Sequence, residues 1–356
     1  IFSVHYPYFF MNTRSISYCI TLVWAVILGM MVRIFLANTT DHSLLSPWQT
    51  IPESAVYLTA GSLFLLGSLI AFSRFPAWLL VIMVSLQTLV MHSYLPLSHE
   101  FFYGADGWRH IASVERISAG LPLTDAATIT SGRTWLQYLN PGIIAYSHLW
   151  CLMLFLHVFG FSFIKIIAWL VPVLWSVIVP ITMFKLGKEL RWSDRTAHMA
   201  SFATLIPFAL VAGGSFTLPN SLGFIVFVPS LIVLVRRLKT GERVWAKWLL
   251  MYGLFLLSGY TLYAILFWMM WGIAEVCLLL SLRAPTQEER GNLSGSNMNL
   301  DNSIIADPTR LSRRGPKGLR RSSRFGSGLS PRNDKLIKIL LLLVCIFSIP
   351  TLELVS

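Results

Sequence analysis

The sequence predicts an all-α protein that crosses a membrane several times, and three observations support this. Of the 356 residues, 55% are hydrophobic and only 12% are charged, whereas soluble domains carry about 25% charged residues. The mean hydropathy of +0.66 is correspondingly high. The apolar residues also gather in long runs, and about 20 apolar residues make a helix that spans a bilayer.

Three such runs are predicted to cross the membrane in the N-terminal part, residues 11–96. They lie at about residues 17–36, 55–72 and 75–94. The first is too long for the apolar centre of a signal peptide, so we expect it to remain in the protein. Arg14 and Arg74 fall on one side of these crossings, whereas residues 37–54 on the other side contain no Lys or Arg. Because basic residues favour the cytoplasmic side, the next polar interval, residues 97–140, is expected outside.

Residues 97–162 are predicted to form an extracytoplasmic loop with an amphipathic helix and an interfacial helix. The first helix follows a Gly-Ala-Asp-Gly turn, has an apolar residue at every third position from Trp108, and ends at Gly120. The second covers residues 140–160, where Tyr, His and Trp are mixed with apolar residues, a composition typical of the membrane interface. We therefore expect it to lie along the outer leaflet without crossing.

The core, residues 163–282, is predicted to contain five crossings. They lie at about residues 163–184, 196–211, 218–235, 248–264 and 267–282. The loops at residues 185–195 and 236–247 hold nine Lys and Arg between them, which favours a cytoplasmic position. The connection at residues 213–220 is then outside, where we expect it to meet the 97–140 interval.

The net charge of +12 does not indicate a nucleic-acid-binding protein. Half of the excess lies in residues 283–335, which hold eleven Lys and Arg against five Asp and Glu. Residues 283–336 are rich in Gly, Ser, Asn and Pro, so we expect a disordered cytoplasmic linker that contacts anionic lipids. Residues 337–356 are predicted to begin another transmembrane helix, in a chain that we expect to be truncated. The four cysteines lack the spacing of a zinc site or a disulfide framework.

The 97–140 interval holds most of the candidate functional residues. Asp106, Arg109 and His110 stand at positions i, i+3 and i+4, which share one face of a helix. A carboxylate beside groups that hold phosphate suits catalysis, with Asp106 as general base or metal ligand. Arg109, His110 and Arg116 are then candidates for substrate binding. In the alternative interpretation Asp106 is a helix N-cap, Arg109 contacts lipid headgroups and His110 fills an interfacial polar site.

Glu275 is the one carboxylate deep in an apolar run, and acids within a membrane are functional candidates. Its place near a helix end equally suits a structural role. It also motivates a second class of function, a non-enzymatic membrane protein such as a transporter or a lipid-handling scaffold. A transporter is expected to show polar residues or broken helices near the bilayer midplane, whereas polarity here gathers in the outer loops.

Several short motifs occur in a fixed order between residues 102 and 271. They are Asp106 with Trp108 and Arg109 before Gly120, Asn140-Pro141-Gly142, Lys188-Glu189-Leu190, Gly214-Ser215-Phe216, Leu238-Lys239-Thr240-Gly241 and Ser258-Gly259-Tyr260. Together they resemble the catalytic subunit of oligosaccharyltransferases and, more broadly, the GT-C superfamily of polytopic glycosyltransferases. The sequence departs from that family at residues 217–219, where Thr-Leu-Pro replaces an acid-x-acid pair.

The resemblance implies a GT-C-like transmembrane helical bundle that transfers a sugar or oligosaccharide from a polyprenyl phosphate or diphosphate carrier. The acceptor is a protein or a glycan at the outer face of a prokaryotic plasma membrane or its endoplasmic reticulum equivalent. In such enzymes the first-loop aspartate, here Asp106, binds a divalent cation such as Mg²⁺ or Mn²⁺ or serves the acceptor. Because residues 217–219 supply no carboxylate, we expect such a cation to bind weakly without the donor's phosphates.

Overall fold

The computed structural model describes residues 13–41, 49–101, 105–121, 141–257 and 260–283. Regular structure in these ranges is helical, apart from one isolated bridge between Thr40 and His99. Five of the described helices are long and apolar enough to cross a membrane. For the described residues, the predictions of an all-α fold and of several helices that could span a membrane are therefore confirmed.

Three helices form the N-terminal part where the apolar runs predicted them. They are α1 (Thr13–Ala37), α2 (Glu53–Phe72) and α3 (Ala77–His92). Pro52 and Pro76 directly precede α2 and α3, where a missing N–H removes no helical hydrogen bond. At 16 residues α3 is shorter than a full span, but the short helix α4 (Tyr94–Ser98) follows it after a single residue.

Three buried polar side chains join α1, α2 and α3 inside the apolar bundle. The indole nitrogen of Trp24 donates to the side-chain oxygen of Gln87, and the amide nitrogen of Gln87 donates to the hydroxyl of Ser62, each across 2.9 Å. In lipid, apolar surface alone does not favour one neighbouring helix over another, whereas hydrogen bonds between helices do. This chain of bonds therefore helps to fix how the three helices pack.

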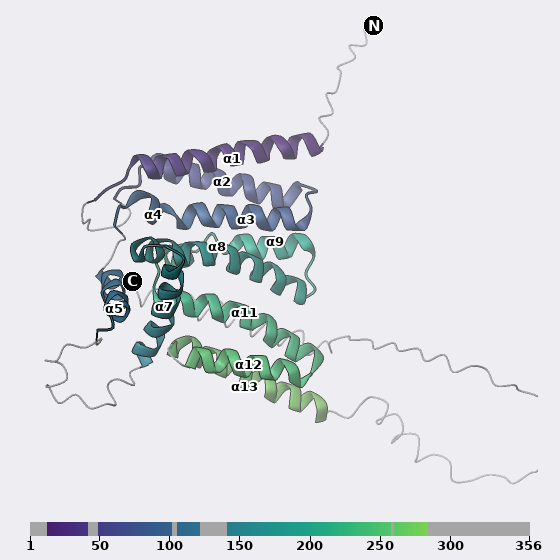
Figure 1. The fold of residues 1–356 in the computed structure, drawn as a ribbon. Helices are drawn as coiled ribbons and strands as arrows, with labels where there is room; N and C mark the ends of the chain where they lie inside the picture. The colour runs from purple at the N-terminus through teal and green to yellow at the C-terminus, as the bar shows by residue number, and fades with distance from the viewer. Residues whose placement is uncertain (1–12, 42–48, 102–104, 122–140, 258–259, 284–356) are drawn as a thin grey trace, which may run out of the picture.

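Helix α5 (Ala105–Ser118) and helix α7 (Pro141–Val158) lie at one end of the bundle. Gly120 follows α5 with a left-handed φ of 67°, which agrees with the predicted stop. Figure 1 shows α7 running crosswise over the ends of the long helices, with α5 beside it. This is the arrangement expected of a helix that does not cross the membrane.

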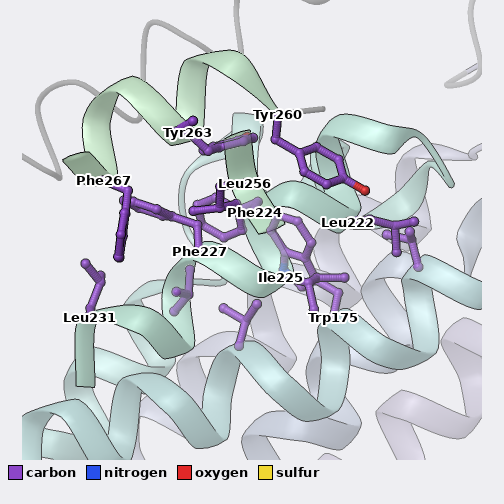
Figure 2. Packing of buried hydrophobic residues seen from close by; sticks show 14 of the residues in the cluster. Trp175, Leu222, Phe224, Ile225, Phe227, Leu231, Leu256, Tyr260, Tyr263 and Phe267 are labelled. Atoms are coloured by element: carbon purple, nitrogen blue, oxygen red, sulfur yellow. The ribbon is translucent and has the colours of Figure 1, made fainter. Parts of the chain in front are cut away.

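The core contains six further helices. They are α8 (Phe163–Glu189), α9 (Asp194–Ala203), α10 (Phe208–Ser215), α11 (Pro219–Thr240), α12 (Arg243–Leu257) and α13 (Thr261–Arg283). Figure 2 shows how α8, α11 and α13 interlock: the ring of Trp175 stacks on Phe224, with centroids 4.7 Å apart, and Tyr263 packs on Phe227. Large aromatic side chains thus fill the space between these helices.

The prediction of one continuous crossing at residues 196–211 is wrong. The chain leaves the helix at residues 204–207 and resumes it after Pro207, so α9 and α10 are separate. Hydroxyl groups satisfy part of the backbone near this break. Thr204 donates to the Ser201 carbonyl across 2.7 Å, and Ser201 donates to the Pro180 carbonyl across 2.9 Å. Broken helices persist at membrane depth where freed backbone groups find such partners.

The predicted boundary between the last two crossings, at residues 264–267, is also wrong. Helix α12 ends at Leu257 and α13 already begins at Thr261. The boundary is difficult to predict because the apolar run is nearly continuous. The Ser258-Gly259 pair is the local sequence signal for a helix break. Helices α8 and α11 extend about one turn beyond the predicted residues 184 and 235.

The connections fall at two opposite ends of the bundle, as Figure 1 shows. One end, here called the cavity end, holds the α1–α2 connection, α4, α5, α7 and the α10–α11 connection. The other end, here called the basic end, holds the α8–α9 and α11–α12 connections. The two segments expected to meet, 97–140 and 213–220, therefore both have described residues at the cavity end. Residues 122–140 and 284–356 lie outside the described ranges.

Candidate functional site

A cavity of about 590 Å³ opens at the cavity end. It is lined by the α1–α2 connection, by α4 and the residues after it, by the first turns of α8 and by residues 215–217. Its polar or charged lining includes Asp41, His99, Glu100, Lys165, Ser215 and Thr217. The cavity therefore gathers two carboxylates, an ammonium group, an imidazole and hydroxyls at one end of a transmembrane bundle.

Two backbone hydrogen bonds bring the carboxylates to the same cavity. The Thr40 nitrogen donates to the Ser98 carbonyl, and the Glu100 nitrogen donates to the Thr40 carbonyl, each across 3.0 Å. Thr40 precedes Asp41, so this short bridge holds Asp41 and Glu100 on two neighbouring segments of the chain. A long-range pairing of this kind leaves no local trace in the sequence.

The 215–217 segment is fixed by contacts with α3 and α8. The hydroxyl of Thr217 accepts from the Val171 nitrogen across 3.2 Å, and the Ser215 hydroxyl lies 3.4 Å from Nδ1 of His92. Gly214 packs directly on the buried His92 ring, and a Cβ atom at residue 214 would lie only 2.6 Å from it. A glycine is therefore required for this close approach.

Lys165 reaches the cavity from the first turn of α8. That helix begins at the N-cap Ser162, whose hydroxyl accepts from the Lys165 nitrogen across 3.4 Å. Among the described residues, neither the Lys165 ammonium nor the Glu100 carboxylate has an ion-pair partner. Two opposite charges that line one cavity without pairing are available to a ligand.

Pro172 leaves one backbone carbonyl of α8 without its usual helical donor. Because proline has no N–H, it cannot bond the carbonyl four residues earlier in α8, which is that of Ala168, a cavity-lining residue. Trp169 beside it presents a large aromatic side chain to the cavity. The wall thus combines an apolar surface with polar groups, the usual composition of a ligand site.

His99 is the one imidazole among the cavity-lining residues, and burial lowers its pKa although the Leu95 backbone carbonyl opposes this shift. Its Nδ1 lies 2.9 Å from the Ser98 hydroxyl, which itself donates to the Tyr94 carbonyl. A lowered pKa favours the neutral ring near neutral pH. His99 therefore adds no fixed positive charge to the cavity.

Asp106 lies within the first turn of α5, but its side chain is outside the described structure. The described helix begins at Ala105, directly before Asp106, and the alternative of an N-cap at Asp106 stays a prediction. Asp106 stands six positions after Glu100 in the sequence, and an extended chain of that length spans at most about 22 Å. The predicted catalytic aspartate is therefore within about 22 Å of a lining residue, and it is not itself among the residues that line the cavity.

The three predicted substrate-binding residues of α5 have different surroundings. His110 is buried, and its Nδ1 accepts from the indole nitrogen of Trp150 in α7 across 3.3 Å. Arg109 is exposed and Arg116 is half-buried. The helix therefore does not present Arg109 and His110 in one environment, because His110 belongs to the face that packs on α7.

Glu275 has a structural explanation. Both of its carboxylate oxygens accept from the Arg237 guanidinium across 2.8 Å, and Oε1 also accepts from the Trp271 indole across 2.9 Å. The ion pair links α11 to α13 near the basic end. Since a guanidinium and a carboxylate match in this two-point geometry, the acid needs no ligand to be stable in its helix.

No family model, no curated protein and no solved structure matches this chain. Its function is therefore inferred from the cavity and from the sequence motifs.

The sequence motifs did not identify three of the cavity-lining residues, Asp41, His99 and Lys165. Lys165 carried the clearest signal, because it is the only Lys or Arg between residues 134 and 184 and stands at the start of an apolar run. Asp41 carried a weaker signal: it is an acidic residue in the interval after the first crossing, residues 37–54, which contains no Lys or Arg. Neither position reveals by itself that the residue lines the same cavity as Glu100.

Proposed function

We propose that this chain is a GT-C-like membrane glycosyltransferase whose cavity binds the polar part of a polyprenyl-linked sugar donor. The observation that carries this proposal is the cavity that Lys165 and Glu100 line without pairing with each other. An ammonium group suits the donor's phosphate. Carboxylates accept hydrogen bonds from sugar hydroxyls, and Trp169 offers a flat apolar surface to the sugar ring.

The proposed reaction exchanges one bond at the sugar's anomeric carbon. An acceptor hydroxyl or amide gives its proton to a carboxylate, for which Asp106 is the proposed base, while its oxygen or nitrogen bonds to the anomeric carbon. The bond from that carbon to the phosphate oxygen breaks, and the phosphate leaves with the electron pair. Lys165 offsets the charge that develops on the phosphate, and Arg109 and Arg116 of α5 are the further cations predicted for this role.

A divalent cation fits the donor set of this cavity, although no cluster of three or more His, Cys, Asp or Glu occurs within the described ranges. Asp41 and Glu100 supply hard oxygen ligands. Mg²⁺ is commonly held by one or two carboxylates together with substrate phosphates and water. When bound, such an ion would neutralise part of the phosphate charge. We expect Asp106 or these two residues to hold it in the presence of donor.

The proposed orientation puts the cavity end outside the cytoplasm. The α8–α9 and α11–α12 connections at the opposite end, with the helix ends beside them, carry nine Lys and Arg at residues 185–195 and 236–247, and such bases favour the cytoplasmic side. In sealed vesicles of known orientation, a cysteine at exposed Asn38 should react with an impermeant maleimide from the side opposite to one at exposed Arg243. Labelling of both from the same side would contradict the proposed topology.

Protection by donor tests the binding role of the cavity. Thr39 lines the cavity and is exposed, whereas its exposed neighbour Asn38 does not line it. In a variant without native cysteines, a polyprenyl phosphate sugar should slow maleimide labelling of Thr39→Cys several-fold and leave Asn38→Cys unchanged. Equal labelling rates of Thr39→Cys with and without donor would contradict the proposal.

A transporter is the second candidate, and the α9–α10 break favours it. Discontinuous helices near the midplane form substrate sites in many transporters. Glu275, which first suggested this class, no longer supports it because Arg237 and Trp271 account for the acid. Uptake of a labelled sugar or lipid by vesicles that hold the purified protein, without any covalent transfer, would favour the transporter.

A further inference from the structure

Helix α7 has two apolar faces, and the described structure covers only one. Leu149, Trp150 and Met153 are buried in the same cluster as Ile111 and Val114 of α5. A second group of side chains at the end of α7 is exposed to solvent: Phe155 is 59% exposed and Val158 83%, and Phe159 and Phe161, just beyond the helix, are 65% and 54% exposed. These four residues are here called the α7 patch.

The α7 patch is organised and carries no charge. Phe155 and Val158 stand at i and i+3 and share one face of α7, and Phe159 follows directly after the helix. The rings of Phe155 and Phe159 meet edge to face with centroids 5.1 Å apart. Residues 149–161 contain no Asp, Glu, Lys or Arg. An exposed apolar patch of this kind marks an interaction surface.

The chain connection places the α7 patch at the boundary of the membrane. Phe161 is two residues from Phe163, the first residue of α8, so it lies within about 7 Å of that helix end. Helix α8 has 27 residues and is apolar enough to cross a membrane. At 1.5 Å per residue it is about 40 Å long, longer than the hydrocarbon layer of about 30 Å. Its ends therefore reach the headgroup layer, and the patch is held there with them.

We propose that the α7 patch inserts between the headgroups and acyl chains of the leaflet at the cavity end, and so anchors α7 in the membrane plane. Apolar faces of interfacial helices bind bilayers in this way through buried area. Because the opposite face of α7 packs on α5, the anchor also holds the helix that carries Asp106 at the membrane surface. The proposal does not depend on the glycosyltransferase activity.

Spin labels at the α7 patch test this insertion. Single cysteines are introduced as Phe155→Cys and Val158→Cys after replacement of Cys19, Cys151, Cys277 and Cys345 by Ser. Two reference positions calibrate the depth: Phe64→Cys on the outside of the spanning helix α2, where Phe64 is 74% exposed, and Glu115→Cys on the exposed side of α5. The labelled full chain is placed in phosphatidylcholine vesicles, and collision rates with oxygen and with a water-soluble nickel complex are measured.

We expect both α7 labels to fall between the two references, with a ratio of oxygen to nickel collisions several-fold above that of the Glu115 reference. A ratio equal to that of the Glu115 reference would overturn the proposal, because the patch would then face water. Dipolar broadening at Phe155→Cys that disappears when labelled protein is diluted with unlabelled protein would overturn it too. That result would identify a second copy of the chain as the partner of the patch.

Discussion

The indole nitrogen of Trp150 donates a hydrogen bond to Nδ1 of His110 across 3.3 Å, and both side chains are buried. This bond joins α7 to α5 and gives His110 a role in helix packing that requires no substrate. It therefore connects the proposed membrane anchor directly to the helix that carries Asp106.

Trp150→Phe and His110→Phe should each lower the free energy of unfolding by about 1–2 kcal/mol, because each removes one hydrogen-bond partner of a buried polar group. The double variant should lose less than the sum of the two single losses, with a coupling of about 0.6–1.7 kcal/mol. Reversible unfolding in mixed micelles measures the three variants. Additive losses would indicate that the bond contributes nothing and would return His110 to the list of substrate-binding candidates.

The ion pair between Arg237 and Glu275 should be structural. Glu275→Leu is expected to cost about 1–3 kcal/mol of stability, since the pair is only partly exposed and its loss leaves Arg237 unpaired. Glu189→Leu is the control, because Glu189 pairs with the more exposed Arg236 and only distantly, across 3.9 Å, with Lys239, and should matter less. Unfolding in micelles measures both. A Glu275→Leu variant with unchanged stability and abolished function would instead support a functional acid.

Gly214→Ala should destabilise the 215–217 segment, because the added Cβ atom would lie 2.6 Å from the His92 ring. Overpacking of this kind costs about 1–3 kcal/mol. Gly61→Ala is the matched control: a Cβ atom there meets nothing within 4 Å, and alanine favours a helix by up to about 1 kcal/mol over glycine. The pair His92→Ala with Gly214→Ala should lose less stability than the two single losses combined. A Gly214→Ala variant as stable as Gly61→Ala would contradict the observed contact.

His99 should make the cavity end sensitive to acid. Burial lowers its folded pKa below the ordinary value of 6.5, so below pH 6.5 the unfolded chain takes up the proton more readily than the folded one. The stability that His99 contributes is therefore present above pH 6.5 and is lost as the pH falls towards its folded pKa. Wild-type protein should lose more thermal stability between pH 8 and pH 5 than His99→Asn. Parallel pH profiles for the two proteins would show that His99 does not titrate in this way.

The long helices can be predicted from the sequence because hydropathy depends on local composition. The positions at which a helix is interrupted cannot be predicted in this way. Pro172 and Pro180 both lie inside the unbroken helix α8, whereas the chain leaves the helix just before Pro207. All three prolines follow apolar residues. The contact of Ser201 with the Pro180 carbonyl illustrates that partners distant in sequence help to decide where a proline is tolerated.

The candidate site was predictable only as a region. The segments at residues 97–140 and 213–220 are expected to lie close together. Glu100 and Ser215, one from each segment, line the same cavity. Asp41 and Glu100 are distant in sequence and come together through the bridge between Thr40 and His99, a contact between two irregular segments without periodicity. Sequence spacing likewise put Arg109 and His110 together, whereas the packing of α7 buries only one of them.

Transfer of labelled sugar tests the proposed function most directly. Purified full-length protein in vesicles is given a polyprenyl phosphate or diphosphate sugar, and the label that moves to protein or glycan acceptors is measured. We predict transfer by the wild type and by Glu115→Gln, an exposed control on α5. Transfer should fall at least tenfold in Lys165→Met, Glu100→Gln and Asp106→Ala, because these variants lose the proposed phosphate, sugar and proton contacts. Equal transfer by all five proteins, or its complete absence with every donor and acceptor offered, would contradict the proposed glycosyltransferase site.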